Sequence, residues 1–244
     1  MVEQQKENQI ISLLKTLWGK ISLSREELDR QSYDGLVNFY DSKYPVQPLY
    51  YAGSSVTIRG KVKVLSIQVC DYLHVTQSMR DWIKEHDLVF DKPVSKQNVW
   101  EHIWKVYSEF TKHTKYVTDI NLYYINEQWV SNMQQMYIME DYKFAGDCEN
   151  FSLLCAGLIQ ASGVPRGLYR VTAGMTKLGG HASLTAYSPD SDDWVQLETT
   201  SKYPYIVGEN DQIYISNVWF SFDSEYSFSN RKIKQVEVKK EAEQ

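Results

Sequence analysis

The sequence is poor in the features that mark secreted or membrane-spanning chains. Its 244 residues include three cysteines, an odd and widely spaced set that predicts no disulfide framework. No apolar run reaches the roughly 18 residues that a membrane helix needs. The polar and acidic start, "MVEQQKENQ", is unlike the basic start of a signal peptide. We therefore expect a cytoplasmic protein with no membrane span.

Positive charge and metal-binding motifs are also scarce. Lys and Arg number 26 against 31 Asp and Glu, a formal net charge of -5, so no broad basic face for nucleic acid is predicted. The chain has no H-x-x-x-H motif, no run of closely spaced His and Cys, and no glycine-rich phosphate loop. We expect neither a metal ion nor a cofactor, and no nucleic-acid partner.

Apolar periodicity predicts several local elements. With 43% hydrophobic residues, the chain can bury a full core. Helical spacing predicts helices at 10–21, at 28–40 after a capping-box pair, and at 95–110, where a broad aromatic stripe is typical of a core-facing helix. β-Branched residues between 55 and 73 favour strands, with a turn at Arg59-Gly60-Lys61.

The predicted division of the chain has three parts. A boundary at "FDKPVSK" separates an N-terminal extension of mixed helix and strand, residues 1–90, from a second domain, residues 91–230. The last residues, 231–244, mix both charges and predict a solvated tail. The first part carries no motif that can be tied to chemistry.

A cysteine stands where a loop turns into a helix. In "FAGDCENFSLLCAGLIQASGVP", residues 144–165, Asp147 is a good N-cap and the apolar residues that follow have helical spacing up to Gly163. Cys148 is then in the first turn, where the helix dipole is expected to lower the pKa of a thiol and enrich the nucleophilic thiolate. Cys155, two turns on, is expected to pack in the core. A buried structural role for Cys148 is the alternative.

One histidine lies downstream of that cysteine. His181 is in "LGGHASLTAY", an alternating strand pattern, and after the turn "SPDSDD" comes a second strand, "WVQLETT". Folding this hairpin brings His181 opposite a position between Glu198 and Thr200, where a carboxylate could orient the imidazole. Asp192 and Asp193 are rivals, but their place in a turn favours solvation.

These segments, in this order, resemble the transglutaminase-like superfamily, relatives of papain-type thiol enzymes, and the compact microbial members in particular. The resemblance covers roughly residues 95 to 200. It implies an α+β fold with a papain/transglutaminase-like core, in which the helix that bears the nucleophile packs on an antiparallel sheet, together with the N-terminal extension. The matching motifs are Gly146-Asp147-Cys148, Gly163-Val164-Pro165, Gly180-His181-Ala182, Trp194 and Leu197-Glu198-Thr199.

Two departures from the family pattern concern the site. Glu198 stands where the family usually has aspartate, so a longer side chain must make the same contact. Asn132 replaces the proline that usually follows an upstream tryptophan, which puts Trp129 in question as an oxyanion donor. Gln128, by likeness to the papain-type glutamine, is the alternative donor.

The resemblance implies thiol chemistry on an amide or peptide bond. Cys148 would attack the carbonyl, His181 would move protons, and Glu198 would orient His181 while a thioester forms. Hydrolysis of a protein or peptide substrate is favoured, because water is always present whereas transfer needs a site that holds an amine. A cross-linking transglutaminase with the same triad and a non-catalytic binding module that keeps the fold are the alternatives.

The segment after Glu198 is rich in Tyr and Trp, as in "KYPYIVGENDQIYISNVWFSF". This composition predicts further strands that pack on the sheet, and contact with substrate in the cleft is the alternative.

Overall fold

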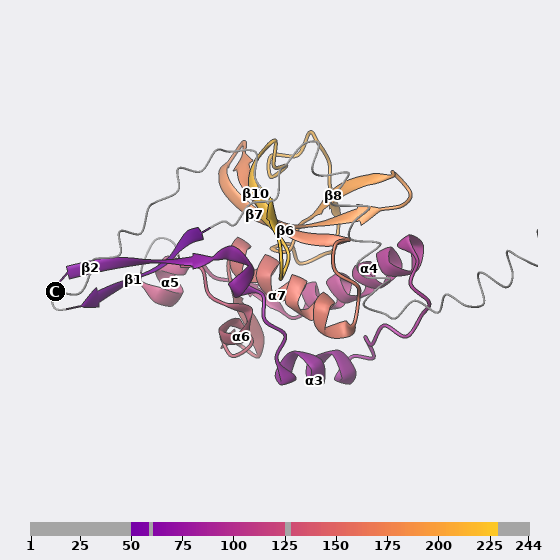
Figure 1. Cartoon of the computed structure of the whole chain (residues 1–244), viewed down its shortest axis with the longest axis horizontal. Helices are drawn as coiled ribbons and strands as arrows, with labels where there is room; N and C mark the ends of the chain where they lie inside the picture. The colour runs from indigo at the N-terminus through magenta and orange to yellow at the C-terminus, as the bar shows by residue number, and fades with distance from the viewer. Residues whose placement is uncertain (1–49, 59–60, 125–127, 229–244) are drawn as a thin grey trace, which may run out of the picture.

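The computed structural model describes residues 50–58, 61–124 and 128–228. Several sequence-based predictions therefore lie outside the described residues: the helices at 10–21 and 28–40, the turn residues 59 and 60, and the charged tail 231–244. In the described part, the main sheet forms one layer and the helices form a second layer against one of its faces, with α7 between the sheet and α3 (Figure 1).

The described residues form helices and strands in a mixed order. The elements are β1 (Tyr50–Ile58), β2 (Lys61–Gln68), the 3-10 helix η1 (Val69–Tyr72), α3 (Gln77–Glu85), α4 (Lys96–Lys112), β3 (Thr114–Tyr116), α5 (Asp119–Tyr123), α6 (Asn132–Gln135), β4 (Met139–Glu140), β5 (Lys143–Gly146), α7 (Cys148–Ser162), β6 (Tyr169–Thr176), β7 (Gly179–Ser188), β8 (Asp193–Leu197), β9 (Ile206–Val207), β10 (Asn217–Phe222) and β11 (Ser227–Phe228).

The main sheet has six strands in the order β11-β10-β6-β7-β8-β9, and each neighbouring pair is antiparallel. The predicted hairpin is confirmed as β7 and β8, which pair with Leu184 opposite Leu197. A second sheet, β3-β5-β4, contains a parallel β3–β5 pair. Strand β5 runs directly into the start of α7, so the small sheet positions the first turn of that helix.

Helix α7 is the centre of the fold. Asp147 and Asn150 cap it reciprocally, and the backbone N–H of Asp147 donates to Asn150 Oδ1 at 3.2 Å. Gly163 ends it in a left-handed conformation, with φ of 95°, as glycine does best. Thirteen of its fifteen residues are buried, which puts helix α7 in the core against β7. The predicted α+β class, a helix that begins with the cysteine packed on an antiparallel sheet, is confirmed.

Helix α4 is the predicted aromatic-striped helix. Ser95 caps it by accepting a hydrogen bond from the backbone N–H of Asn98 at 3.1 Å. Val106, Tyr107 and Phe110 are fully buried, as expected for a core-facing stripe. The Tyr107 hydroxyl donates to the backbone carbonyl of Glu198 at 2.7 Å, which ties α4 to the end of the main sheet.

The region before α4 joins the same core. β1 and β2 form the predicted antiparallel pair, but the strand prediction is wrong from residue 69 onward, because Val69–Tyr72 coils into η1 and buries three of its four side chains. Met79 and Ile83 of α3 lie in the core cluster that contains α7. The division at residue 90 stays a prediction. Within the described residues, we find no helix with the length and apolar content to cross a bilayer.

Gly157 of α7 tests how tightly this core is packed. A Cβ at Gly157 would lie 2.1 Å from Asn132 Nδ2 and 2.9 Å from Met79 Cε. Alanine favours a helix over glycine by about 1 kcal/mol, whereas overpacking costs about 1–3 kcal/mol. We expect Gly157→Ala to lower the free energy of unfolding, measured by urea denaturation.

Gly208 is the control position. A Cβ there would come no closer than 3.6 Å to Asp211 Oδ2, so Gly208→Ala should change stability by less than about 0.5 kcal/mol. An unchanged or higher urea midpoint for Gly157→Ala would show that Asn132 of α6 can move away from the added methyl group without loss of stability.

Candidate active site

One pocket brings together segments that lie far apart in the sequence. Cys148, at the start of α7, and His181, near the start of β7, both line a cavity of about 330 Å³. The remaining walls come from the loop before α6, from β6 and from β10. The full lining is Trp129, Cys148, Glu149, Ala173, Gly180, His181, Ala182, Trp219 and Phe220.

The thiol of Cys148 is half-buried and has an acidic neighbour. Its Sγ donates to Glu149 Oε2 at 3.3 Å. Burial, followed by the charge of Glu149, raises the pKa of Cys148 well above its usual range, while the backbone N–H of Ala182 acts in the opposite direction. The expectation that the helix start lowers this pKa is wrong for this arrangement, because desolvation and nearby carboxylates outweigh the helix dipole.

Three acidic residues lie around the start of α7, and two of them are buried. Asp119 and Glu149 are almost fully buried, and the backbone N–H of Asp119 donates to Asp147 Oδ2 at 3.4 Å. Burial, with the hydrogen bond and charge of Asp147 and the charge of Asp119, raises the pKa of Glu149 to about 10. Asp147 was expected as a helix cap and as part of the Gly146-Asp147-Cys148 motif, but the acids on both sides of Cys148 were also a signal for this cluster.

The same first turn offers one set of possible metal ligands. A carboxylate oxygen of Asp147, one of Glu149 and the sulfur of Cys148 all lie within 4.8 Å of one another. Two carboxylates and a thiol could hold a divalent cation. The expectation of no metal stays a prediction.

His181 is held by a carboxylate. Its Nε2 lies 2.7 Å from Glu198 Oε2, and the Glu198 side chain is only 2% exposed. Since a carboxylate accepts, the Nε2–H of His181 is the donor, and Nδ1 carries the lone pair in the neutral ring. The neighbourhood predicted from the hairpin is correct. Both rivals are engaged elsewhere: Asp192 accepts from the Tyr187 hydroxyl and Asp193 from the Trp194 backbone.

Each carboxylate oxygen of Glu198 has a donor. Oε2 pairs with His181, and Oε1 accepts from the backbone N–H and hydroxyl of Thr200 at 2.8 and 2.6 Å. Burial acts to raise the pKa of Glu198, but the hydrogen bonds and charge of His181, with the bonds from Thr200, outweigh it and lower the pKa. The longer side chain thus reaches both partners from the end of β8. From the sequence, Thr200 was expected only as a position opposite His181 in the hairpin.

The two candidate oxyanion donors differ in position. Trp129 is buried, lines the pocket with Cys148, and has its ring 6.0 Å from that of Phe220. The side-chain amide of Gln128 instead donates to the carbonyl of Trp129 at 3.2 Å, and Gln128 is not part of the pocket lining. Asn132, which stands in the place of the family's proline, is buried and accepts from the backbone N–H of His74 at 2.8 Å.

The aromatic segment after Glu198 contributes both to the pocket and to the core. Trp219 and Phe220 of β10 line the pocket, whereas Phe222 and Phe228 are fully buried. A Cβ at Gly180 would approach Trp219 Cη2 to 3.0 Å, so the glycine before His181 leaves room for this indole. The pocket that Cys148 and His181 line therefore also contains aromatic side chains, and no short sequence motif predicted them.

The core matches what the resemblance implies: a helix that begins with the cysteine, packed on the antiparallel sheet that carries the histidine and the acid. No family model matches the sequence, and no curated protein does.

Solved structures with a similar chain path include proteins of two organisms. LapG of Legionella pneumophila is 18% identical, with 65% of this chain and 89% of that chain covered and a TM-score of 0.46. Its calcium-bound form is 20% identical, with 66% and 84% covered and a TM-score of 0.45. A protein of Cytophaga hutchinsonii, described as a proposed cysteine protease, is 16% identical, with 66% and 62% covered and a TM-score of 0.34. At identities and TM-scores this low, the likenesses carry no information on activity.

The lowered pKa of Glu198 makes stability depend on pH. Its pKa in the folded protein is below the unfolded value of about 4.3, so its contribution is full above that value and is lost as pH falls through the folded pKa. We expect the stability difference between the wild-type protein and Glu198→Gln, measured by urea denaturation, to be larger at pH 7 than at pH 3.

Glu101 provides the matched control, since it is an exposed glutamate on α4. Glu101→Gln should show a small difference that changes little between the two pH values. A Glu198→Gln difference of the same size at pH 7 and pH 3 would contradict an ionised, hydrogen-bonded Glu198.

Proposed function

We propose that this protein is a thiol hydrolase that cleaves an amide or peptide bond through Cys148, His181 and Glu198. The observation that carries the proposal is a single one: the histidine that lines the cysteine's pocket is hydrogen-bonded to a buried carboxylate. A nucleophile, a base and a group that orients the base are the parts that such chemistry requires.

The proposed first step couples attack with proton transfer. Because the pKa of Cys148 is raised, the thiol keeps its proton until a base removes it. The lone pair on Nδ1 of His181 takes that proton as Sγ attacks the carbonyl carbon. The carbon–nitrogen bond then breaks, the amine leaves with a proton from His181, and a thioester remains on Cys148.

The second step returns the enzyme to its starting state. Water attacks the thioester carbon, His181 accepts a proton from that water, and the carbon–sulfur bond breaks to release a carboxylic acid. The sulfur regains its proton from His181. Glu198 stays ionised throughout and stabilises the imidazolium that forms in each step, which agrees with its lowered pKa.

We assign the oxyanion site to the start of α7. The backbone N–H of Cys148 belongs to the first helical turn, where N–H groups have no partner within the helix. Trp129 is the preferred side-chain partner over Gln128, because Trp129 lines the pocket and the Gln128 amide is bonded to a backbone carbonyl. Loss of one such donor costs about a hundredfold in rate or more.

A protein or peptide is the proposed substrate. Trp129, Trp219 and Phe220 give the pocket aromatic walls that suit the side chains of a polypeptide. Cross-linking to an amine would use the same three residues, and a binding module could keep the pocket without chemistry. Cross-linking differs from hydrolysis in the molecule that accepts the acyl group, an amine instead of water. A binding module differs from both in that Cys148 would not be reactive.

Alkylation tests whether His181 activates Cys148. We expect iodoacetamide at pH 7 to label Cys148, because Cys70 and Cys155 are buried. His181→Ala should slow the labelling about tenfold or more, since the base is gone. Glu198→Asp keeps the charge but shortens the side chain, so it should give a partial loss. The modified cysteine is located by mass spectrometry, and its rate is measured.

His74→Ala is the control for the alkylation experiment, because His74 is exposed. It should label at the wild-type rate. Equal rates for His181→Ala and the wild-type protein would count against an activated thiol and in favour of the binding module.

The acyl acceptor is tested with a peptide library in water enriched in oxygen-18, with and without a lysine analogue such as cadaverine. We expect new carboxylates that carry the heavy oxygen and depend on Cys148, because no amine site is needed for hydrolysis. Cys148→Ala should abolish the products. Faster release of the thioester by cadaverine than by water, with amide products, would make the protein a transglutaminase.

A further inference from the structure

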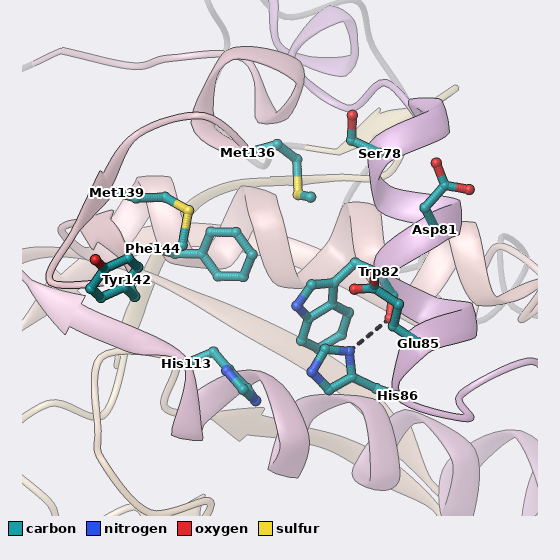
Figure 2. Close-up of a pocket in the computed structure, with 10 residues that line it drawn as sticks. All are labelled: Ser78, Asp81, Trp82, Glu85, His86, His113, Met136, Met139, Tyr142 and Phe144. Carbon is teal, nitrogen blue, oxygen red and sulfur yellow. Dashed lines mark hydrogen bonds between the residues drawn. The ribbon is translucent and has the colours of Figure 1, made fainter.

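A second cluster of reactive side chains lies away from the thiol pocket. His86 caps the C-terminus of α3, while Glu109 and His113 belong to the last turn and the C-cap of α4. One ligand atom from each residue lies within 4.8 Å of the others. Figure 2 shows the two imidazoles next to each other at one edge of a pocket of about 470 Å³. Their rings are nearly perpendicular, with centroids 4.9 Å apart.

His86 is already oriented as a metal ligand would be. Its Nδ1–H donates to the backbone carbonyl of Trp82 at 2.8 Å, so the lone pair of the neutral ring is on Nε2. Histidines that bind metals commonly donate their other ring N–H to a carbonyl or carboxylate in this way. The indole of Trp82 stacks on the ring at 4.1 Å and holds its plane.

Glu109 and His113 already have the spacing of neighbouring ligands. Glu109 Oε1 lies 3.2 Å from His113 Nε2, and ligand atoms on a tetrahedral zinc ion are about 3.3 Å apart. The other carboxylate oxygen accepts from Lys112 at 2.6 Å.

We propose that His86, Glu109 and His113 form a binding site for a divalent transition-metal ion of the zinc type. Two imidazoles and a carboxylate suit zinc, whereas calcium and magnesium prefer oxygen ligands alone. The Glu109 and His113 side chains are 26% and 37% exposed, so an ion can enter from solvent. The ion would fasten the C-terminal end of α3 to that of α4, and this role does not depend on the proposed thiol chemistry.

The test measures zinc binding to the full chain after treatment with a chelator. Isothermal titration is carried out in the Cys148→Ala background, which removes the thiol that could bind zinc at the start of α7. One zinc ion per chain is expected. His86→Ala, His113→Ala and Glu109→Gln should each weaken binding about tenfold or more.

Two variants serve as matched controls. His74→Ala removes an exposed histidine and Glu101→Gln an exposed glutamate of α4, and both should bind zinc as the background protein does. The melting temperature of each metal-free variant is measured alongside, so that a loss of fold is recognised. Zinc should raise the melting temperature of the background protein and of both controls, but not that of the three ligand variants.

Cobalt provides a reading that does not depend on stability. Cobalt bound by nitrogen and oxygen ligands in the Cys148→Ala background should give a visible spectrum, and each ligand variant should lose it. Zinc or cobalt binding that survives in all three ligand variants would overturn the proposal. So would binding that is seen with the wild-type chain but is lost on the change Cys148→Ala, without any change at His86, Glu109 or His113. So would the absence of zinc binding to the full chain.

Discussion

The arrangement of the site depends on one buried carboxylate, that of Glu198. Its Oε2 accepts from His181 on β7, its Oε1 accepts twice from Thr200, and its backbone carbonyl accepts from Tyr107 on α4. A buried carboxylate is costly unless each oxygen has a donor, and here the donors come from separate parts of the fold. The position of the imidazole against the cysteine pocket is therefore coupled to the packing of α4 and the main sheet.

Opposing effects act on the pKa of Cys148: the helix dipole lowers it, whereas burial and a neighbouring carboxylate raise it. A helix N-terminus stabilises a nearby negative charge by about 0.3–1 kcal/mol, which is less than one pKa unit. Burial and the neighbouring Glu149 act in the opposite direction and prevail, so the thiol rather than the thiolate is the resting form. If the thiol reacts, a base must take its proton, and this requirement gives the contact between His181 and Glu198 its chemical meaning.

Local sequence signals predicted the elements that depend on neighbours along the chain. The Ser95 cap and aromatic periodicity of α4, the Asp147 cap and Gly163 end of α7, and the β7–β8 hairpin all follow from residues within a few positions of one another. They could not show that residues 69–72 coil into a 3-10 helix, because that turn serves packing against distant core residues. Cys148, His181 and Glu198 were predicted as site residues from their order in the sequence, and their catalytic roles stay a prediction.

The sequence by itself determined the helix that begins at Cys148 and the hairpin that carries His181, since caps and periodicity act locally. The α+β class was expected from the order of the motifs and the family they resemble. The tertiary structure decided what surrounds each group. It buries Glu149 beside Asp147 and Asp119, and it brings His86 next to Glu109 and His113, which no sequence spacing linked to it. Burial and charge depend on contacts between residues far apart in the chain, so pKa values and ligand clusters emerge only when the chain is folded.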